Sequence, residues 1–124
     1  MKKIYFISTC TTCTNIIKTW NINESIKKID LKKHPLKESD LEELFNISKS
    51  YESLFNKRAI LFREMKKKLK KINEKDYKKM LLSHYSFLKR PVLLINEKLF
   101  IGNSKEIVNK AALEIKSIFN LKTN

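Results

Sequence analysis

The sequence predicts an α/β fold that opens with a strand–helix–strand unit, continues through an all-helical middle third, and closes with a hairpin and a helix. Three observations predict it. Apolar residues in the first thirty positions follow strand and then helix spacing. Those in the middle follow helix spacing alone, and two short apolar runs near the C-terminal end flank a turn. At 124 residues, 42% of them hydrophobic, the chain is expected to form one domain over residues 1–124.

The first thirty residues predict a βαβ unit. Residues 3–8 hold a continuous apolar run and predict a buried strand, residues 12–21 predict a helix, and residues 25–30 predict a second strand. Because a helix connects the two strands, they should be parallel with a right-handed crossover. The buried face of the helix is expected to carry Cys13, Ile16, Ile17 and Trp20.

The middle third contains only helical patterns. Ser39 and Glu42 fit a capping box, which predicts the start of a short helix. Residues 57–71 and 75–85 predict two more helices, the second with Asn73 as its N-cap. Phe62, Met65, Leu69 and Ile72 recur at helical spacing through the first of these and the basic run that overlaps it, and the inward positions of the second are Tyr77, Met80, Leu81 and His84 or Tyr85.

A β-hairpin and a last helix are predicted at the C-terminal end. Residues 92–95 and 99–101 form its two apolar runs, and Asn96 can take the left-handed turn conformation between them. Gly102, the only glycine in the chain, follows the hairpin and marks a backbone site that no side chain fits. Ser104 should cap the helix, whose apolar stripe is Ile107, Val108, Ala111, Ile115 and Ile118.

The segment Cys10-Thr11-Thr12-Cys13 holds the only two cysteines and lies where the first strand turns into the first helix. Free amides and the dipole at a helix N-terminus favour a thiolate and lower its pKa. This placement predicts thiol redox chemistry or thiolate attack. The alternative is a pair of reduced cysteines that pack as small hydrophobes. No metal is expected, since the other candidate ligands are only His34 and His84, in no standard spacing.

The formal net charge of +14 predicts a positive field that attracts phosphate, arsenate, nucleic acid or an acidic protein. Residues 63–79 concentrate it, with nine Lys and Arg against three acids. Apolar residues recur at helical spacing within this run, which favours a solvated face of a core-packed helix over a nucleic-acid surface. Because no nucleic-acid-binding motif accompanies the run, no sequence-specific contact with nucleic acid is expected.

No stretch of the sequence matches a membrane span or a signal peptide, because Ser8 and the Thr/Cys cluster interrupt the first apolar run. The protein is therefore expected to be cytoplasmic, without membrane contact, and monomeric. Thiols are kept reduced in the cytoplasm, so the cysteine pair is interpreted as reactive and not as a structural disulfide.

The chain resembles the ArsC/Spx family, the arsenate-reductase-like branch of thioredoxin-fold proteins, along nearly its whole length. The matching motifs, in order, are Cys10-x-x-Cys13, His34-Pro35-Leu36, Leu54-Phe55-Asn56-Lys57-Arg58, Lys89-Arg90-Pro91-Val92 and Phe100-Ile101-Gly102-Asn103-Ser104. The resemblance implies a thioredoxin-like α/β fold with a four-stranded mixed sheet, βαβ then ββα. It also implies an all-helical insertion over about residues 36–88 between the two halves.

The same resemblance implies the site and its reaction. Cys10 is the nucleophile that attacks an oxyanion or a disulfide, and Cys13 is the resolving thiol that closes a disulfide with it. Arg58 and Arg90 hold the oxyanion, for which a planar guanidinium is well suited, and Pro91 is the cis proline of the fold. No bound cofactor is implied. Glutathione with glutaredoxin, or thioredoxin, would supply electrons, so the expected partners are a small oxyanion or thiol substrate and a redox protein.

Three departures from the glutathione-coupled reductases favour an alternative. Gly102-Asn103 stands where they place a third arginine, Thr14 replaces an arginine, and Phe6 replaces a histidine. Cys13 is absent from those enzymes and present in Spx-like members. The alternative is therefore an Spx-like regulator that senses disulfide stress and binds the α subunit of RNA polymerase.

Overall fold

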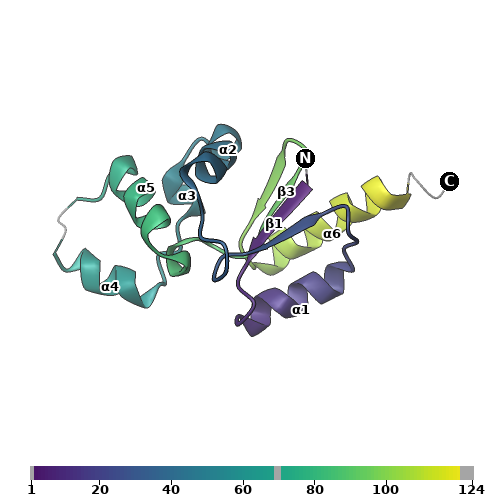
Figure 1. Cartoon of the computed structure of the whole chain (residues 1–124), viewed down its shortest axis with the longest axis horizontal. Coiled ribbons are helices and arrows are strands. Elements are labelled where there is room, and N and C mark those ends of the chain that lie inside the picture. Colours follow the sequence, from purple (N-terminus) through teal and green to yellow (C-terminus); the bar gives the residue numbers. More distant parts are fainter. Residues whose placement is uncertain (1, 69–70, 121–124) are drawn as a thin grey trace. The chain divides into compact units, whose positions relative to one another are not determined.

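A computed structural model of the chain describes residues 2–68 and 71–120 (Figure 1). The chain divides into two compact units. Unit 1 comprises Met1–Asp30 and Arg90–Asn124, and unit 2 comprises Leu31–Lys89. The helical insertion expected at about residues 36–88 falls within unit 2, while the single domain over residues 1–124 stays a prediction.

Unit 1 is built on a four-stranded sheet of order β2-β1-β3-β4. β1 pairs with β2 in parallel, whereas the β1–β3 and β3–β4 pairs are antiparallel. The sheet is therefore mixed, and the predicted thioredoxin-like α/β fold is confirmed. The strands are β1 (Lys2–Phe6), β2 (Lys27–Asp30), β3 (Val92–Ile95) and β4 (Lys98–Ile101).

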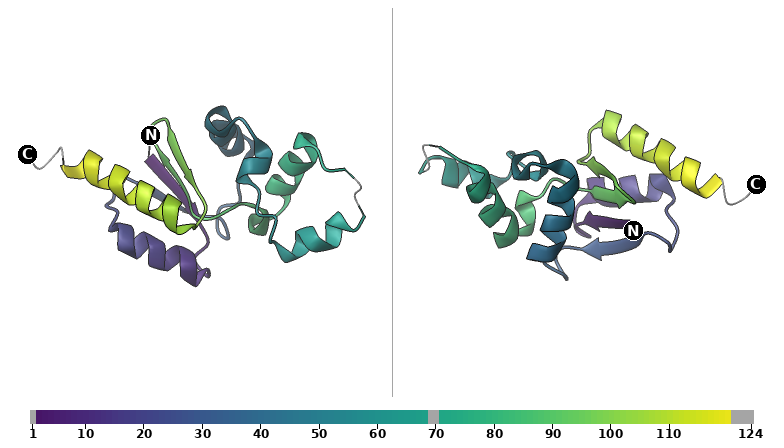
Figure 2. Two further views of the ribbon diagram at one scale, coloured as in Figure 1. Left: turned by 180° about the vertical axis from the view of Figure 1, so that it is seen from behind. Right: turned by 90° about the horizontal axis from the view of Figure 1, so that it is seen from above.

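The helices α1 (Thr11–Trp20) and α6 (Lys105–Asn120) lie beside each other against one face of this sheet (Figure 2). Trp20 joins them, because its indole Nε1–H donates to the carbonyl oxygen of Val108 at 3.0 Å. Of their predicted apolar stripes, Ile17, Trp20, Ala111 and Ile115 are buried, while Ile16, Val108 and Ile118 are partly buried against the same core and Ile107 is half-buried. The buried ones form one core cluster with the sheet, made of Ile4, Ile17, Trp20, Ile26, Leu93, Ile95, Ala111 and Ile115.

The turns of unit 1 follow the predicted residue types. Asn96 has φ 55° between β3 and β4, and Gly102 has φ 92° after β4, so both lie in the left-handed region. Ser104 Oγ accepts the Ile107 N–H at 3.3 Å at the start of α6. Across the described ranges, 2–68 and 71–120, no helix is long and apolar enough to cross a membrane.

Two strands of unit 1 are shorter than predicted. β1 ends at Phe6, because Ile7 C=O accepts the Cys10 N–H at 3.0 Å and closes a turn where residues 7 and 8 were expected to continue the strand. β2 begins only at Lys27, because Asn23 Oδ1 accepts the Ser25 N–H at 2.8 Å in a preceding turn. At the end of β1 and the start of β2, local hydrogen bonds thus compete with sheet pairing for the backbone groups.

Unit 2 is helical and packs around an aromatic cluster. Phe55 is fully buried, with its ring centroid 4.9 Å from Phe62, 4.9 Å from Tyr77 and 5.3 Å from Phe87. Tyr77, Met80 and Leu81 are buried as predicted. The helices are α2 (Glu38–Ser48), α3 (Tyr51–Leu54), α4 (Ile60–Lys66), α5 (Glu74–Ser83) and the 3₁₀ helix η1 (Tyr85–Phe87).

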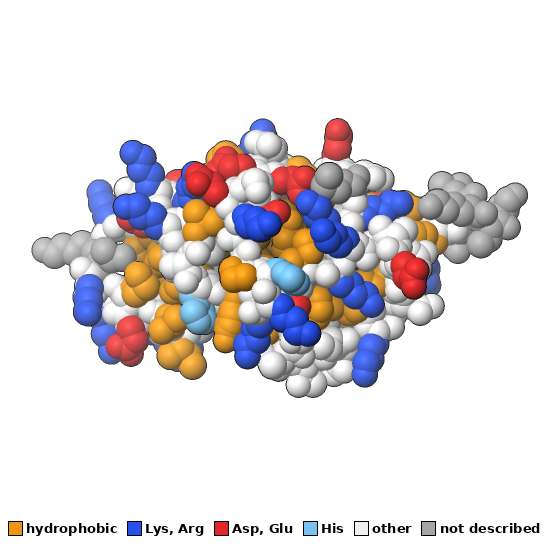
Figure 3. Space-filling view, in the orientation of Figure 1, with side chains coloured by type: hydrophobic (Ala, Val, Ile, Leu, Met, Phe, Trp, Pro, Cys, Tyr) orange, Lys and Arg blue, Asp and Glu red, His pale blue; other side chains and the backbone are white. Residues whose placement is uncertain are grey.

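The described residues of the basic run, 63–68 and 71–79, are largely solvent-exposed, as expected for a solvated face. Arg63 and Lys66 to Lys68 are exposed, while Phe62 and Tyr77 attach the helices on either side to the core. Figure 3 shows Lys and Arg side chains spread over the visible face of the molecule, with acidic side chains between them. The charge is thus distributed and not confined to one helix.

The capping box predicted at Ser39 and Glu42 is wrong. α2 begins at Glu38, and the carboxylate of Asp40 accepts the Lys37 backbone N–H at 3.2 Å. Asp40 therefore takes the part predicted for Glu42, with the Lys37 N–H in place of the Ser39 N–H, two residues earlier, and Ser39 lies inside the helix. The Asn73 cap is confirmed, since its side chain accepts the Asp76 N–H at 3.0 Å.

The helix predicted over residues 57–71 is shorter than expected. It begins at Ile60, because Asn56 Oδ1 accepts the Arg58 N–H at 3.1 Å and holds residues 56–59 in a turn. Met65 is 37% exposed and not buried, and Ile72 lies outside the helix. Leu69 lies outside the described residues.

The helix predicted over residues 75–85 ends early, at Ser83. The next residue, His84, is extended and exposed. Either His84 or Tyr85 was expected to point inward, and His84 does not. Its ring Nδ1 instead accepts the Ser86 backbone N–H at 3.1 Å and caps η1. Tyr85 is half-buried.

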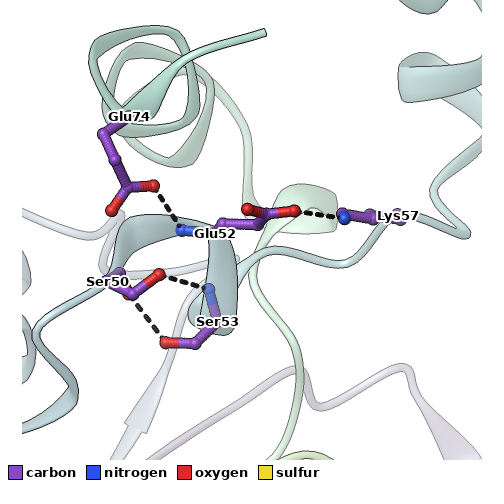
Figure 4. A network of polar contacts seen from close by, with 5 residues as sticks. All are labelled: Ser50, Glu52, Ser53, Lys57 and Glu74. Atoms are coloured by element: carbon purple, nitrogen blue, oxygen red, sulfur yellow. Dashed lines mark hydrogen bonds and ion pairs between the residues drawn. The ribbon is translucent and has the colours of Figure 1, made fainter.

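The short helix α3 was not predicted, and contacts from distant residues stabilise it (Figure 4). Ser50 Oγ accepts the Ser53 N–H at 3.1 Å, and the carboxylate of Glu74 accepts the N–H groups of Tyr51 at 2.8 Å and Glu52 at 3.0 Å. Glu52 in turn forms an ion pair with Lys57. Four residues carry too little periodicity to predict a helix whose first amides bind a carboxylate more than twenty positions away.

Candidate active site

Cys10 is the N-cap residue of α1. Its N–H donates to Ile7 C=O at 3.0 Å, and its own C=O accepts the Thr14 N–H at 3.1 Å, so the backbone on both sides is held. Cys10 is half-buried, whereas Cys13 is fully buried on the apolar face of α1; both are free thiols. The strand–turn–helix placement predicted for the pair is confirmed.

The surroundings of Cys10 favour its thiolate. Partial burial raises its pKa, but polar interactions with the Cys13 backbone N–H, the Cys13 thiol and the Arg90 guanidinium outweigh burial. The positive charge of Arg90 acts in the same direction. The pKa of Cys10 is therefore below its ordinary value of 9.0, which increases the fraction of the nucleophilic form near neutral pH.

Cys13 has the opposite character. Burial raises the pKa of Cys13 to about 12, and the hydrogen bond and negative charge of Cys10 add to this effect. The backbone at Ile7 and the charge of Arg90 lower the pKa only in part. The two sulfurs are thus unequal: Cys10 is half-buried with a lowered pKa, and Cys13 is a buried thiol with a raised pKa.

Arg90 reaches Cys10 because of the strand register. β1 and β3 are antiparallel, with Tyr5 opposite Val92, so the chain leaving β1 toward Cys10 lies beside the chain entering β3 from Arg90. The Arg90–Pro91 peptide bond is cis, which is the geometry that the family resemblance implies for Pro91. Pro91 C=O accepts the Gly102 N–H at 2.9 Å and ties this entry to the end of the hairpin.

Asp30 is a site residue that sequence reasoning missed. It ends β2 opposite Phe6, is only 8% exposed, and its Oδ1 accepts the Ser8 N–H at 3.2 Å. It therefore holds the turn between β1 and Cys10, which makes it a positioning residue. The signal in the sequence was a single acidic residue at the end of an apolar strand, where a carboxylate is rarely buried without a partner.

Arg58 belongs to unit 2, where its side chain is exposed. The segment before it is tied to the residues that precede Arg90 in the chain. Asn56 N–H donates to Phe87 C=O at 2.7 Å, and Lys89 N–H donates to Leu54 C=O at 2.9 Å. Of the predicted site residues, the structure brings Cys10, Cys13 and Arg90 together within unit 1.

This mixed sheet, with a Cys-x-x-Cys pair at the first helix and a cis proline opening the third strand, defines a thioredoxin-like protein with a thiol site. The chain belongs to the ArsC family, whose family model matches residues 5–111. No curated protein matches the chain.

Solved structures share this fold. An arsenate reductase (ArsC) related protein from Brucella melitensis is 25% identical, with a TM-score of 0.64 over 85% of this chain and 88% of that one. An arsenate reductase from Vibrio cholerae is 14% identical, with a TM-score of 0.70 over 92% and 96%. The protein YffB (PA3664) is 20% identical, with a TM-score of 0.70 over 91% and 99%.

Proposed function

We propose that this protein is a cytoplasmic thiol oxidoreductase of the arsenate-reductase type, with Cys10 as the nucleophile and Cys13 as the resolving thiol. The observation that carries the proposal is the inequality of the two sulfurs, one with a lowered and one with a raised pKa. Membership of the ArsC family supports the same reaction class. Reducing conditions in the cytoplasm would keep both thiols available.

With arsenate as substrate, the Cys10 thiolate attacks arsenic and a water molecule leaves, so that an S–As bond replaces an As–O bond. Cys13 then loses its proton and attacks Cys10 Sγ. The S–S bond forms as the S–As bond breaks, and its electron pair reduces As(V) to As(III). The two thiols supply the two electrons, and glutathione with glutaredoxin, or thioredoxin, would reduce the resulting disulfide.

With a disulfide substrate, the same residues act in the same order. Cys10 attacks one sulfur of the substrate and releases the other as a thiolate, forming a mixed disulfide. Cys13 attacks Cys10 Sγ and releases the second substrate thiol. The substrate gains two electrons and the protein loses two, so both substrates leave the same Cys10–Cys13 disulfide.

The arginines are assigned to the oxyanion. Arg90 supports this role, because its guanidinium already interacts with Cys10 and would stabilise charge on both sulfur and oxygen. For Arg58 the proposal rests on the family resemblance and on the exposure of its side chain. A planar guanidinium pairs with two oxygens of a tetrahedral anion, which lysine cannot do.

The test is arsenate reduction by the purified chain, with glutathione and glutaredoxin or with thioredoxin as the electron donor. Cys10→Ser should abolish turnover. Cys13→Ser should stop turnover through a local disulfide, yet its Cys10 should still be alkylated at mildly acidic pH. Preferential alkylation of Cys13 in the unmodified protein would reverse the roles, and turnover by Cys10→Ser would exclude the mechanism.

A second function is favoured by Gly102-Asn103 after the hairpin, where the glutathione-coupled reductases place an arginine. A site with fewer cations binds a divalent oxyanion less tightly. The protein would then be an Spx-like regulator that binds the RNA polymerase α subunit. A pull-down with purified α subunit, using reduced and oxidised protein, tests it: redox-dependent binding without arsenate turnover supports the regulator, and turnover without binding supports the enzyme.

A further inference from the structure

The helix α4 exposes large apolar side chains to solvent. Ile60 is 76% exposed, Leu61 43% and Met65 37%, and they lie within six residues of one another. The same helix is attached to the core of unit 2 by Phe62, which is only 4% exposed and whose ring contacts Phe55. α4 is thus anchored on one side and apolar on another. Leu61 and Met65 are four residues apart and so share a face of the helix, and clustered exposed apolar side chains mark interaction sites in soluble proteins.

Basic side chains surround these apolar residues. Within residues 57–68 there are six Lys and Arg against one acid, Glu64, for a local charge of +5. Lys57 is paired with Glu52, while the side chains of Arg58, Arg63, Lys66, Lys67 and Lys68 are exposed. In Figure 3 this end of unit 2, at the left, carries blue basic side chains beside orange apolar ones. An apolar centre with a basic rim is complementary to an acidic amphipathic partner.

We propose that Ile60, Leu61 and Met65, with the basic side chains around them, form a docking surface for an acidic amphipathic helix of a partner protein. We call it the α4 surface. The apolar side of such a helix would cover the three exposed side chains, and its acidic residues would meet the basic rim. Met65 suits this role, because its flexible thioether adapts to the shape of a partner. The residues of this surface belong to unit 2, whereas Cys10, Cys13 and Arg90 belong to unit 1.

The same observations disfavour other occupants. A second copy of the chain carries a net charge of +14 and would be repelled. Single-stranded nucleic acid binds through aromatic side chains on which bases stack, and the exposed apolar residues of α4 are aliphatic or thioether. A membrane surface needs an amphipathic helix that buries a long apolar face, whereas α4 has seven residues and gives Phe62 to the core of unit 2.

The test is a binding titration of the full chain with a fluorescent peptide of about 16 residues, long enough to form a helix when bound. The peptide carries Leu and Phe on one helical face and Glu elsewhere. The double variant Leu61→Ser/Met65→Ser should weaken binding by roughly tenfold or more. Leu113→Ser is the matched control, because Leu113 is a 68% exposed apolar residue on α6 in unit 1, and it should leave binding unchanged.

Two further arms separate the proposed surface from simple charge attraction. A scrambled peptide of the same composition, without an apolar face, should bind at least tenfold more weakly. The charge reversal Lys66→Glu/Lys67→Glu should weaken binding of the unscrambled peptide and reduce the salt dependence of that binding. Equal binding of both peptides, or equal weakening by Leu113→Ser, would overturn the proposal. The proposal would also be overturned by two results together. These are that the acidic peptide does not bind, and that anionic vesicles or DNA do bind and are bound more weakly by Leu61→Ser/Met65→Ser.

Discussion

Unit 1 and unit 2 are stabilised by different interactions and serve different chemistry. Unit 1 depends on strand pairing between segments far apart in the chain, and it contains Arg90 and Ile7, which act with the two cysteines on the pKa values of Cys10 and Cys13. Unit 2 depends on rings packed around Phe55 and on helix caps, and it contains Arg58 and the α4 surface. These side-chain and backbone influences on the sulfurs thus come from unit 1, while unit 2 contributes charge and contact surface.

The largest expected effect is on unit 2. Phe55→Ala should destabilise the protein by about 3–5 kcal/mol, because it removes a fully buried ring that contacts three others. Urea unfolding measures the loss. The pH profile of Cys10 alkylation in the folded variant should stay unchanged, since unit 1 holds the groups that set it.

Leu93→Ala is the matched change in unit 1, because Leu93 is also fully buried. It should cost about 2–5 kcal/mol and also alter the alkylation profile, since β3 positions Arg90. If Phe55→Ala moved the profile as much as Leu93→Ala does, the separation of the two units would be wrong.

Arg90→Ala should slow Cys10 alkylation below pH 8 by about tenfold, which corresponds to losing one hydrogen bond to a charged group. The sign follows from the lowered pKa. The thiolate of the unmodified protein forms below pH 9.0, and removing Arg90 raises the pKa, so less thiolate is present at the same pH. The rate of Cys10 alkylation in the two proteins, measured as a function of pH, tests this.

Arg58→Ala is the control for that experiment, since Arg58 belongs to unit 2. It should weaken oxyanion affinity without moving the alkylation profile. If Arg58→Ala shifted the alkylation profile and Arg90→Ala did not, Arg58 and not Arg90 would be the residue that stabilises the Cys10 thiolate.

Helix caps give a smaller effect and compare the units directly. Asn73→Ala should cost about 1 kcal/mol, because the Asn73 side chain and the Asp76 carboxylate each accept a backbone N–H of the other residue at 3.0 Å. Ser104→Ala in unit 1 should cost less, since its single bond is 3.3 Å and exposed. Thermal unfolding of the two variants measures the order, and a larger loss for Ser104→Ala would contradict it.

The smallest effect is expected at a surface ion pair. Lys110 Nζ lies 3.0 Å from Glu106 Oε1 on α6, and both side chains are more than half exposed. Lys110→Gln should change stability by at most about 0.5 kcal/mol, and less at high salt. A loss above 1 kcal/mol in denaturant unfolding would mean that α6 depends on this pair.

Local patterns sufficed to predict most of unit 1. Its apolar stripes, the Asn96 turn and the positive φ of Gly102 each follow from residues close in sequence. Unit 2 was harder, because its helix ends depend on side chains such as Asn56 and Asp40 that compete for backbone amides. α3 exists through Glu74, which no local pattern reveals.

The candidate site divides in the same way. The strand–turn–helix pattern predicted the positions of Cys10 and Cys13, since the relevant amides are their immediate neighbours. The approach of Arg90 depends on the β1–β3 register, which the sequence alone does not specify. Asp30 was missed for a similar reason, because its contact with Ser8 spans two strands. The role of Arg58 stays a prediction.

The coupling between the two sulfurs has a consequence for timing. Two of the three influences that raise the pKa of Cys13 come from Cys10, through its hydrogen bond and its negative charge. In the mixed disulfide formed with a disulfide substrate, Cys10 Sγ is no longer a charged acceptor, so both influences are lost, while burial, the largest influence, remains opposed by the Arg90 charge and the backbone at Ile7. Cys13 therefore becomes easier to deprotonate only after Cys10 has reacted. The first step of the reaction thus favours the second, the attack of Cys13 on Cys10 Sγ.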